Sequence, residues 1–116
     1  MDADMRTVTI SIDSRDAIRE RARRAAVGAP QGAHITFPSV ELLWRVISPK
    51  RLEILRVLAG AERLSIREVA RRVGRDVKAV HGEIHALADA GIVSIDADGV
   101  LLGYDEIHVN FTLQAA

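Results

Sequence analysis

Apolar and polar residues alternate at both ends of the chain, which is the pattern of a strand with one buried face. Residues 6–14 carry branched apolar side chains at every second position, namely Val8, Ile10 and Ile12. The same alternation near the other end of the chain gives a second apolar face, made of Ile107, Val109, Phe111 and Leu113. Each face needs a partner, and the two can pair with each other within one chain or across a dimer.

An arginine-rich helix is predicted over residues 15–27, directly after the first strand. Asp13 or Ser14 can cap its start, and a loop over residues 28–32, which contains glycine and proline, ends it. Its apolar positions are mostly alanine, so this helix offers only a weak stripe for packing.

Short elements continue the chain. Residues 34–37 predict a strand, and apolar residues at helical spacing predict a helical segment over residues 40–47. Ser48 and Pro49 then open a longer helix, with Ser48 as N-cap and Pro49 at the first helical position. Gly60 ends this helix, whose apolar face is formed by Leu52, Ile54, Leu55 and Leu58.

Two further helices follow, separated by a glycine turn. Ser65 and Glu68 predict a capping box, in which each side chain satisfies the backbone N–H of the other residue. Gly74 permits a left-handed turn, Asp76 caps the last helix, and Gly91 closes it. The inward faces consist of Ile66, Val69, Ala70 and Val73 on the first of these helices and Val77, Val80, Ile84, Leu87 and Ala88 on the second.

A β-hairpin is predicted after the last helix. Residues 92–96 and 100–102 flank Ala97-Asp98-Gly99, and Asp-Gly is a strong turn signal. Helices followed by a hairpin in this order indicate a winged helix-turn-helix. We therefore expect an α+β fold with a strand–helix arm in residues 1–32, used for dimerisation or partner binding. Residues 33–116 would form the winged helix-turn-helix DNA-binding domain and end in a strand.

The charge of the chain is divided between two regions. The formal net charge is zero, with 16 basic and 16 acidic residues. Residues 49–82 nevertheless hold nine Lys or Arg against four Asp or Glu, whereas residues 83–116 hold six acidic residues and no Lys or Arg. Because nucleic acids attract clustered positive charge, this distribution favours a DNA-binding surface that ends near Gly82.

The outer face of the last helix carries the residues that we expect to contact DNA. The first turn of such a helix can enter a major groove about 12 Å wide. Arg75, Lys78 and His81 can donate to phosphates or base edges, and the small residues Ala79 and Gly82 permit close approach to the duplex. The complete set of candidates is Ser65, Arg67, Arg71, Arg72, Arg75, Lys78, Ala79, His81, Gly82 and His85.

The tip of the hairpin is acidic, with Asp96 and Asp98 beside the turn. Carboxylates close to phosphates are repelled by about 1 kcal/mol or more per pair where screening is incomplete. We therefore expect the tip to stand away from DNA and the acidic part of the chain to face something else.

Other chemistries find little support. His81 and His85 have the spacing of two zinc ligands on a helix, but Gly82 follows His81, so the H-E-x-x-H pattern is absent, and the chain has no cysteine. We expect no metal and no cofactor. The chain has no phosphate loop, no G-x-S-x-G motif and no nucleophile–base pair, and we expect that it is not an enzyme.

The absence of cysteine excludes disulfides. The acidic N-terminus lacks the apolar run of a signal peptide, and no apolar stretch approaches the roughly 18 residues of a membrane span. These features predict a cytoplasmic protein without a membrane partner.

Several motifs resemble one family: SPKRLEILRVL, LSIREVARRVGRDVKAVHGEIHALADAGIV, DADG and YDEIHVNFTL. Over about residues 37–113 the chain is similar to small prokaryotic predicted transcriptional regulators with a MarR-like winged helix. Some members of that family lie beside toxin genes and are regarded as antitoxins. The resemblance implies DNA contact through Arg75, Lys78 and His81 and a role as repressor or antitoxin.

Together these observations predict a sequence-specific DNA-binding transcriptional regulator. We expect a homodimeric repressor on double-stranded DNA, since one recognition helix reads few base pairs and a two-fold dimer reads two half-sites. One alternative is an antitoxin that also neutralises a toxin protein through its arm or its acidic region. Another is a protein-interaction module with the same fold and no DNA partner.

Overall fold

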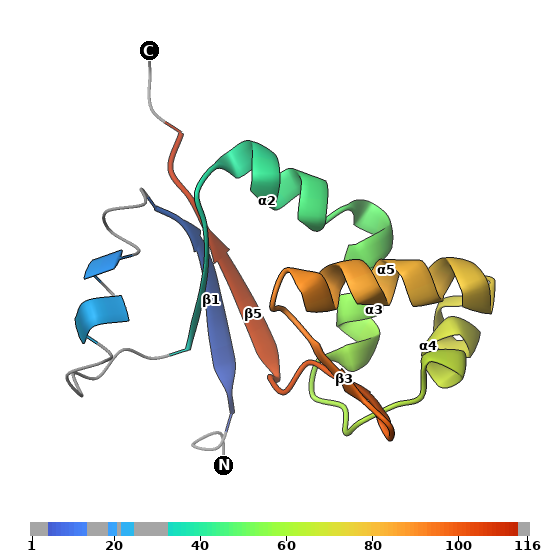
Figure 1. The fold of residues 1–116 in the computed structure, drawn as a ribbon. Helices are drawn as coiled ribbons and strands as arrows, with labels where there is room; N and C mark the ends of the chain where they lie inside the picture. Colours follow the sequence, from blue (N-terminus) through green and yellow to red (C-terminus); the bar gives the residue numbers. More distant parts are fainter. Residues whose placement is uncertain (1–4, 14–18, 21, 25–32, 114–116) are drawn as a thin grey trace.

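The computed structural model describes residues 5–13, 19–20, 22–24 and 33–113 (Figure 1). Its elements are β1 (Thr7–Ile12), β2 (His34–Phe37), α2 (Val40–Val46), α3 (Pro49–Leu58), α4 (Ile66–Val73), α5 (Val77–Asp89), β3 (Ser94–Asp96), β4 (Gly99–Leu101) and β5 (Glu106–Asn110). The fold is therefore α+β, as the sequence predicts. Most of the predicted helix over residues 15–27 and the loop over residues 28–32 lie outside the described residues; residues 19–20 and 22–24 are helical.

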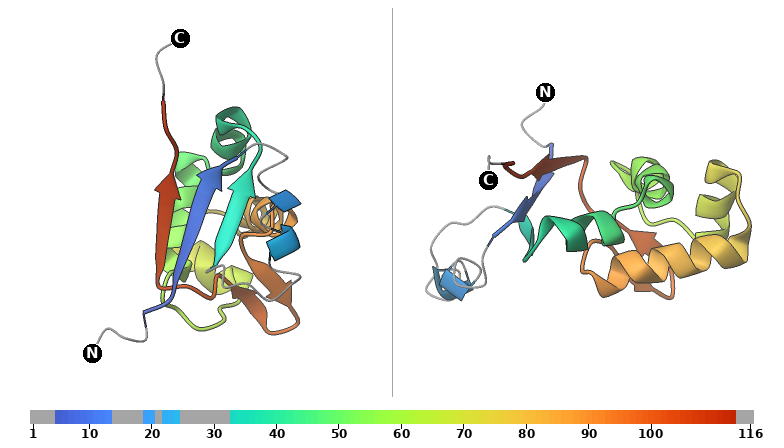
Figure 2. Two further views of the ribbon diagram at one scale, coloured as in Figure 1. Left: turned by 90° about the vertical axis from the view of Figure 1, so that its left-hand side faces the viewer. Right: turned by 90° about the horizontal axis from the view of Figure 1, so that it is seen from above.

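The two ends of the chain meet in one parallel sheet of order β2–β1–β5. Figure 2 shows β1 between the other two strands, with α2, α3, α4 and α5 behind one face. Val8 pairs with Ile107 and Ile10 pairs with Val109, and both β1 side chains are fully buried. The two predicted apolar faces thus lie side by side within one chain. β1, the strand of the predicted arm, is also hydrogen-bonded to β2. The domain boundary predicted at residue 32 would therefore separate two strands of one sheet.

Side-chain caps start α2 and α3. Ser39 Oγ accepts a hydrogen bond from the backbone N–H of Leu42 at 3.2 Å, which starts α2. Ser48 Oγ accepts from the N–H of Arg51 at 3.3 Å, and Pro49 is the first residue of α3. The predicted N-cap and the predicted helix start are both confirmed.

The turn between α4 and α5 also follows the predicted capping. Ser65 Oγ accepts from the N–H of Glu68 at 3.0 Å, Gly74 adopts the left-handed conformation, and Asp76 Oδ2 accepts from the N–H of Ala79 at 3.2 Å. The predicted capping box also requires the Glu68 carboxylate to accept from the N–H of Ser65, and this part of the prediction is wrong. The carboxylate of Glu68 accepts instead from arginines one turn further along α4, where charged donors form stronger hydrogen bonds than a backbone N–H.

The hairpin β3–β4 is tied to the segment that precedes α4. Asp96 pairs with Gly99, so the turn comprises Ala97 and Asp98, and Gly99 already belongs to β4. Leu64 and Val100 exchange two backbone hydrogen bonds of 3.0 and 2.7 Å. The hairpin is therefore held at a fixed place beside the helices.

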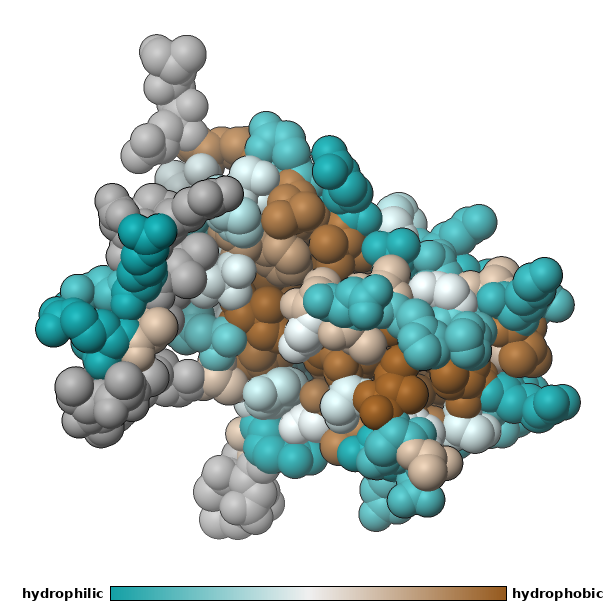
Figure 3. Space-filling model, viewed as in Figure 1, coloured by the Kyte–Doolittle hydropathy of each residue, from teal (hydrophilic) through white to brown (hydrophobic). Residues whose placement is uncertain are grey.

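One hydrophobic core joins the sheet, the helices and the hairpin. Its fully buried large side chains are Val8, Ile10, Leu43, Ile54, Leu58, Val69, Val80, Ile84, Leu87 and Val100. Four residues of the predicted apolar faces are exposed instead: Leu52 and Val77 are each 39% exposed, Val109 is 44% exposed, and Leu113, beyond the end of β5, is 83% exposed. In Figure 3, hydrophobic residues gather on the visible face between the sheet and the helices. No helix in the described part of the chain is long and apolar enough to cross a membrane.

Candidate functional site

The outer face of α5 carries five of the ten residues that the sequence assigns to DNA contact. Val80, Ile84 and Leu87 are completely buried, so they fix the inner face of the helix. The positions opposite to them are all exposed, namely Lys78, Ala79, His81, Gly82 and His85. One side of α5 is thus anchored in the core by α3 and α4, while the other is open over more than two turns.

Gly82 lies near the middle of this open face. Glycine within a helix destabilises it by about 0.5–1 kcal/mol relative to alanine, because the unfolded backbone is freer. A Cβ atom added at Gly82 would meet nothing within 4 Å, and the residue does not have a positive φ. Neither its backbone conformation nor packing against the described residues therefore requires glycine at this position.

His81 and His85 stack on the same face. Their ring centroids lie 4.2 Å apart, and the ring planes are tilted by 34°. Both side chains are exposed, so their ring nitrogens can reach an external group. Among the described residues, no group of three His, Asp or Glu side chains is placed to hold a metal ion.

Arg75 occupies a different environment from the one the sequence suggested. Its Nη2 donates to the backbone carbonyl oxygen of Lys50 at 2.7 Å, and its guanidinium lies 4.0 Å from carboxylate oxygens of Glu53 and Glu83. The side chain is only 21% exposed, and Nε is buried without a hydrogen-bond partner. Arg75 therefore connects α3 to the start of α5, and its side chain points to α3 and not outward. Contact of Arg75 with DNA stays a prediction.

A second ion pair connects the same two helices. Arg51 Nε donates to Glu83 Oε1 at 3.0 Å, with both side chains 21% exposed. Arg51 Nη1 also donates to the carbonyl oxygens of Arg45 and Val46 near the end of α2. Glu83 thus lies between Arg51 and Arg75, and this arrangement fixes the position of α5 relative to α3. Sequence analysis missed the cluster, because its members come together only in the folded chain.

The basic residues of α4 are partly neutralised by one carboxylate. Glu68 accepts hydrogen bonds from Nε of Arg71 at 2.9 Å and from Nε of Arg72 at 2.7 Å. These bonds, with Arg71 as the larger cause, lower the pKa of Glu68 from 4.5 to about 2. The same pairing raises the pKa of Arg71. Arg71 and Arg72 remain at the surface, but they share a negative neighbour.

Two other candidates lie at the start of α4. The hydroxyl of Ser65 is used as the N-cap of the helix, whereas the side chain of Arg67 is exposed. Exposed Lys50, at the start of α3, adds a basic group beside Arg75 that the sequence-based set did not include. The sequence alone does not show that Lys50 lies beside Arg75, because the two meet only in the folded chain, where Arg75 donates to the carbonyl oxygen of Lys50.

The hairpin tip carries less free negative charge than its composition suggests. Arg63 donates to the carbonyl oxygen of Gly99 at 3.2 Å and lies 3.3 Å from Oδ2 of Asp96. Asp96 in turn accepts from the N–H of Asp98 at 2.8 Å, which shapes the turn. Glu83 and Asp96 thus both pair with arginines of the same chain, although Asp96 stays half-exposed. Asp98 is also exposed at the tip.

Comparison with known proteins places the chain in a family. A search of curated proteins finds no match to the sequence. Residues 46–109, which include α3, α4, α5 and the hairpin, match the sequence model of the family described as HVO_A0114. The match covers more than half of the 116 residues, and the chain therefore belongs to the HVO_A0114 family.

Proposed function

We propose that this chain is a sequence-specific DNA-binding transcriptional regulator that inserts the outer face of α5 into the major groove. The observation that carries the proposal is the open face of α5 around Gly82. A helix glycine with no role inside the chain is explained if another molecule approaches the helix closely there. Lys78 and the stacked pair of His81 and His85 surround this point with hydrogen-bond donors.

The arrangement of the neighbouring elements supports the same proposal. In our interpretation α3, α4, α5 and the hairpin form a winged helix of the MarR-like type. The hairpin would be the wing, held by its bonds to Leu64. Ion pairs from Arg51 and Arg75 fix α5 at the angle at which it would meet DNA. A rigidly placed helix loses little conformational freedom when it binds.

The basic groups on either side of α5 would contact phosphates. Arg67, Arg71 and Arg72 on α4 are exposed, and contacts of this kind fix the register of a protein on the duplex. The acidic tip at Asp98 would lie away from the backbone of the DNA. Most of the affinity would then come from phosphate contacts, and Lys78, His81 and His85 would supply the sequence preference.

The proposal is tested by selecting genomic DNA fragments with the purified chain and then measuring affinity against salt concentration. An enriched palindromic sequence is expected, with log affinity falling by about 0.9 per neutralised phosphate for each unit of log salt. Lys78→Gln should weaken binding and make this slope shallower. Arg45→Gln removes a charge from an exposed position on α2 and should leave the slope unchanged if α2 lies away from the DNA. Absence of salt-dependent DNA binding would overturn the proposal and favour a protein-interaction module.

A further inference from the structure

We infer that β5 pairs with the β5 strand of a second copy of this chain and forms a continuous six-stranded sheet across a two-fold axis. The inference deepens the proposed function and rests on it in one respect, because a palindromic DNA site requires two recognition helices. Its main support is the edge of the sheet itself.

Among the residues that the structure describes, no strand pairs with the outer edge of β5. In the described part of the chain β5 pairs only with β1, and Figure 2 shows it at the margin of the sheet. Natural edge strands are usually protected by lysine, proline or a bulge. The sequence of β5, Glu-Ile-His-Val-Asn, contains neither lysine nor proline. An unprotected edge of this kind is suited to pairing with another strand.

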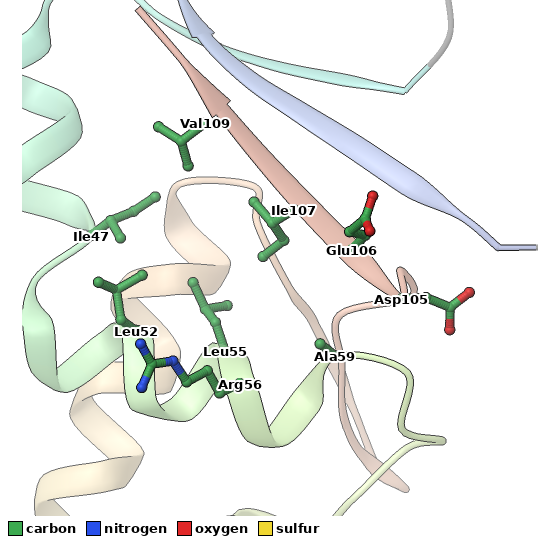
Figure 4. Close-up of a pocket in the computed structure, with 9 residues that line it drawn as sticks. All are labelled: Ile47, Leu52, Leu55, Arg56, Ala59, Asp105, Glu106, Ile107 and Val109. Atoms are coloured by element: carbon green, nitrogen blue, oxygen red, sulfur yellow. The ribbon is translucent and has the colours of Figure 1, made fainter.

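Beneath this edge lies an apolar groove between β5 and α3 (Figure 4). Ile107 and Val109 point toward Leu52 and Leu55 of α3 and toward Ile47, which follows α2, and the groove has a volume of about 290 Å³. Nearby in the sequence, the half-exposed ring of Trp44 lies edge-to-face against the partly buried ring of Phe111, one residue beyond β5, at a centroid distance of 5.5 Å.

Several side chains of this surface are more exposed than apolar groups usually are in a core. Trp44 is 52% exposed, Val109 44% and Leu52 39%. A contiguous apolar surface beside an open strand indicates a protein contact. A second β5 strand would cover it with two further branched side chains.

The backbone pattern of β5 fixes which residues can pair. The N–H of Glu106 donates to the carbonyl oxygen of Arg6 in the segment before β1. Backbone groups alternate in direction along a strand, so the N–H and C=O groups of Ile107 and Val109 point to the open edge. In an antiparallel pair centred on His108, Ile107 of one copy would exchange two hydrogen bonds with Val109 of the other.

This register also matches the side chains. On the apolar face, Ile107 and Val109 of each copy would lie opposite Val109 and Ile107 of the other, over the two grooves. On the polar face, Glu106 would lie opposite Asn110, and the two copies of His108 would face each other. No pair of like charges is opposed when the histidines are neutral, and aliphatic cross-strand pairs stabilise a sheet.

The absence of cysteine from the chain permits a direct test. Two His108 residues at a two-fold axis would form a pair without backbone hydrogen bonds, whose Cα atoms lie about 4.5 Å apart. A disulfide bond can form between two cysteines whose Cα atoms are this far apart. The variant His108→Cys should therefore become a covalent dimer under mild oxidation.

Matched controls on the same strand and face define the register. Glu106→Cys and Asn110→Cys should each stay monomeric on a denaturing gel, because four residues of strand, about 13 Å, separate the two thiols. A mixture of these two variants should form a cross-linked heterodimer. Cross-linking of none of these samples would overturn the proposed pairing.

A second variant separates this inference from the proposed function. Val109→Glu places a carboxylate in the apolar contact at an already half-exposed position. By sedimentation it should shift from twice the chain mass to the chain mass, with an unchanged circular dichroism spectrum. A wild-type chain that dimerises and cross-links but binds no DNA would overturn only the proposed function. A chain that binds a palindrome without cross-linking at His108 would overturn only the β5 interface.

Discussion

Nη2 of Arg75 donates a 2.7 Å hydrogen bond to the backbone carbonyl oxygen of Lys50. The two residues are 25 positions apart and join the start of α5 to the start of α3. This contact gives Arg75 a structural role, whereas its position in the sequence alone would assign it to DNA recognition.

We predict that Arg75→Ala lowers the stability of the protein. The substitution removes a charge-assisted hydrogen bond and leaves Glu83 with one arginine partner fewer, at a cost of about 1–2 kcal/mol. Urea unfolding followed by circular dichroism measures this loss. Arg67→Ala, at an exposed position on α4, is the control and should change stability by less than about 0.5 kcal/mol. Equal stability of the two variants would contradict the structural role of Arg75.

Gly99→Ala is predicted to be strongly destabilising. Gly99 has a φ of 126°, and a Cβ atom there would collide with the carbonyl oxygen of Leu64. The substitution must therefore break the contact between the hairpin and the segment before α4, with an expected loss of at least about 2 kcal/mol. Thermal unfolding measures the effect.

The matched control for this prediction is Gly103→Ala. Gly103 also has a positive φ, of 84°, but a Cβ atom there would meet nothing within 4 Å. Only the backbone strain remains, which costs about 1–2 kcal/mol. A loss at Gly103 as large as that at Gly99 would mean that the close approach to Leu64 is unimportant.

The local features of the fold could be predicted from sequence, because each depends on residues within a few positions. The caps at Ser48, Ser65 and Asp76 and the left-handed turn at Gly74 are of this kind. The parallel pairing of β1 with β5 could not be predicted. The alternating patterns indicate that both strands bury one face, but they do not say which strand lies beside which.

The same limit applies to the candidate site. Helical periodicity correctly separates the outer face of α5 from its buried face at Val80 and Ile84. It does not tell that Arg75 turns back toward α3, because an arginine side chain is long enough to reach either a neighbouring helix or an external phosphate. The pairs Arg51–Glu83 and Arg63–Asp96 are likewise set by tertiary packing, since the two members of each pair lie more than 30 positions apart.

Glu68 is expected to make stability depend on pH in the acidic range. Its pKa in the folded chain is lowered from 4.5 to about 2, mainly by hydrogen bonds from Arg71 and then Arg72. A group whose folded-state pKa is depressed stabilises the fold fully above its unfolded pKa. That contribution is lost as pH falls from about 4.5 to about 2. Glu68→Gln should therefore show a flatter dependence of unfolding free energy on pH across this window.

A direct titration checks the cause. NMR of the Glu68 carboxyl group should report the lowered pKa in the native chain, and Arg71→Gln should raise it, because Arg71 provides the larger effect. An unchanged pKa of Glu68 in Arg71→Gln would show that the ion pair is not formed in solution.

The same glutamate is predicted to limit affinity for DNA. Glu68 forms ion pairs with Arg71 and Arg72. The uncharged amide of Glu68→Gln would break these pairs and leave both guanidinium groups available to phosphates. We expect tighter binding and a steeper salt dependence, by about 0.9 in slope for each phosphate gained. Titrations at several salt concentrations measure both quantities. Weaker binding by this variant would show that the pair orients the arginines rather than competing for them.

Substitutions at Gly82 are expected to separate stability from DNA binding. Alanine and leucine both favour a helix more than glycine does, and the position has free space, so each variant should gain about 0.5–1 kcal/mol of stability. The loss of DNA affinity should grow with the size of the new side chain: about tenfold for Gly82→Ala, which corresponds to about 1.4 kcal/mol, and more for Gly82→Leu. Urea unfolding and DNA titration on the same samples measure the two effects. Native affinity in the leucine variant would show that nothing approaches α5 closely at Gly82, and the proposed recognition face would then have to lie elsewhere on the chain.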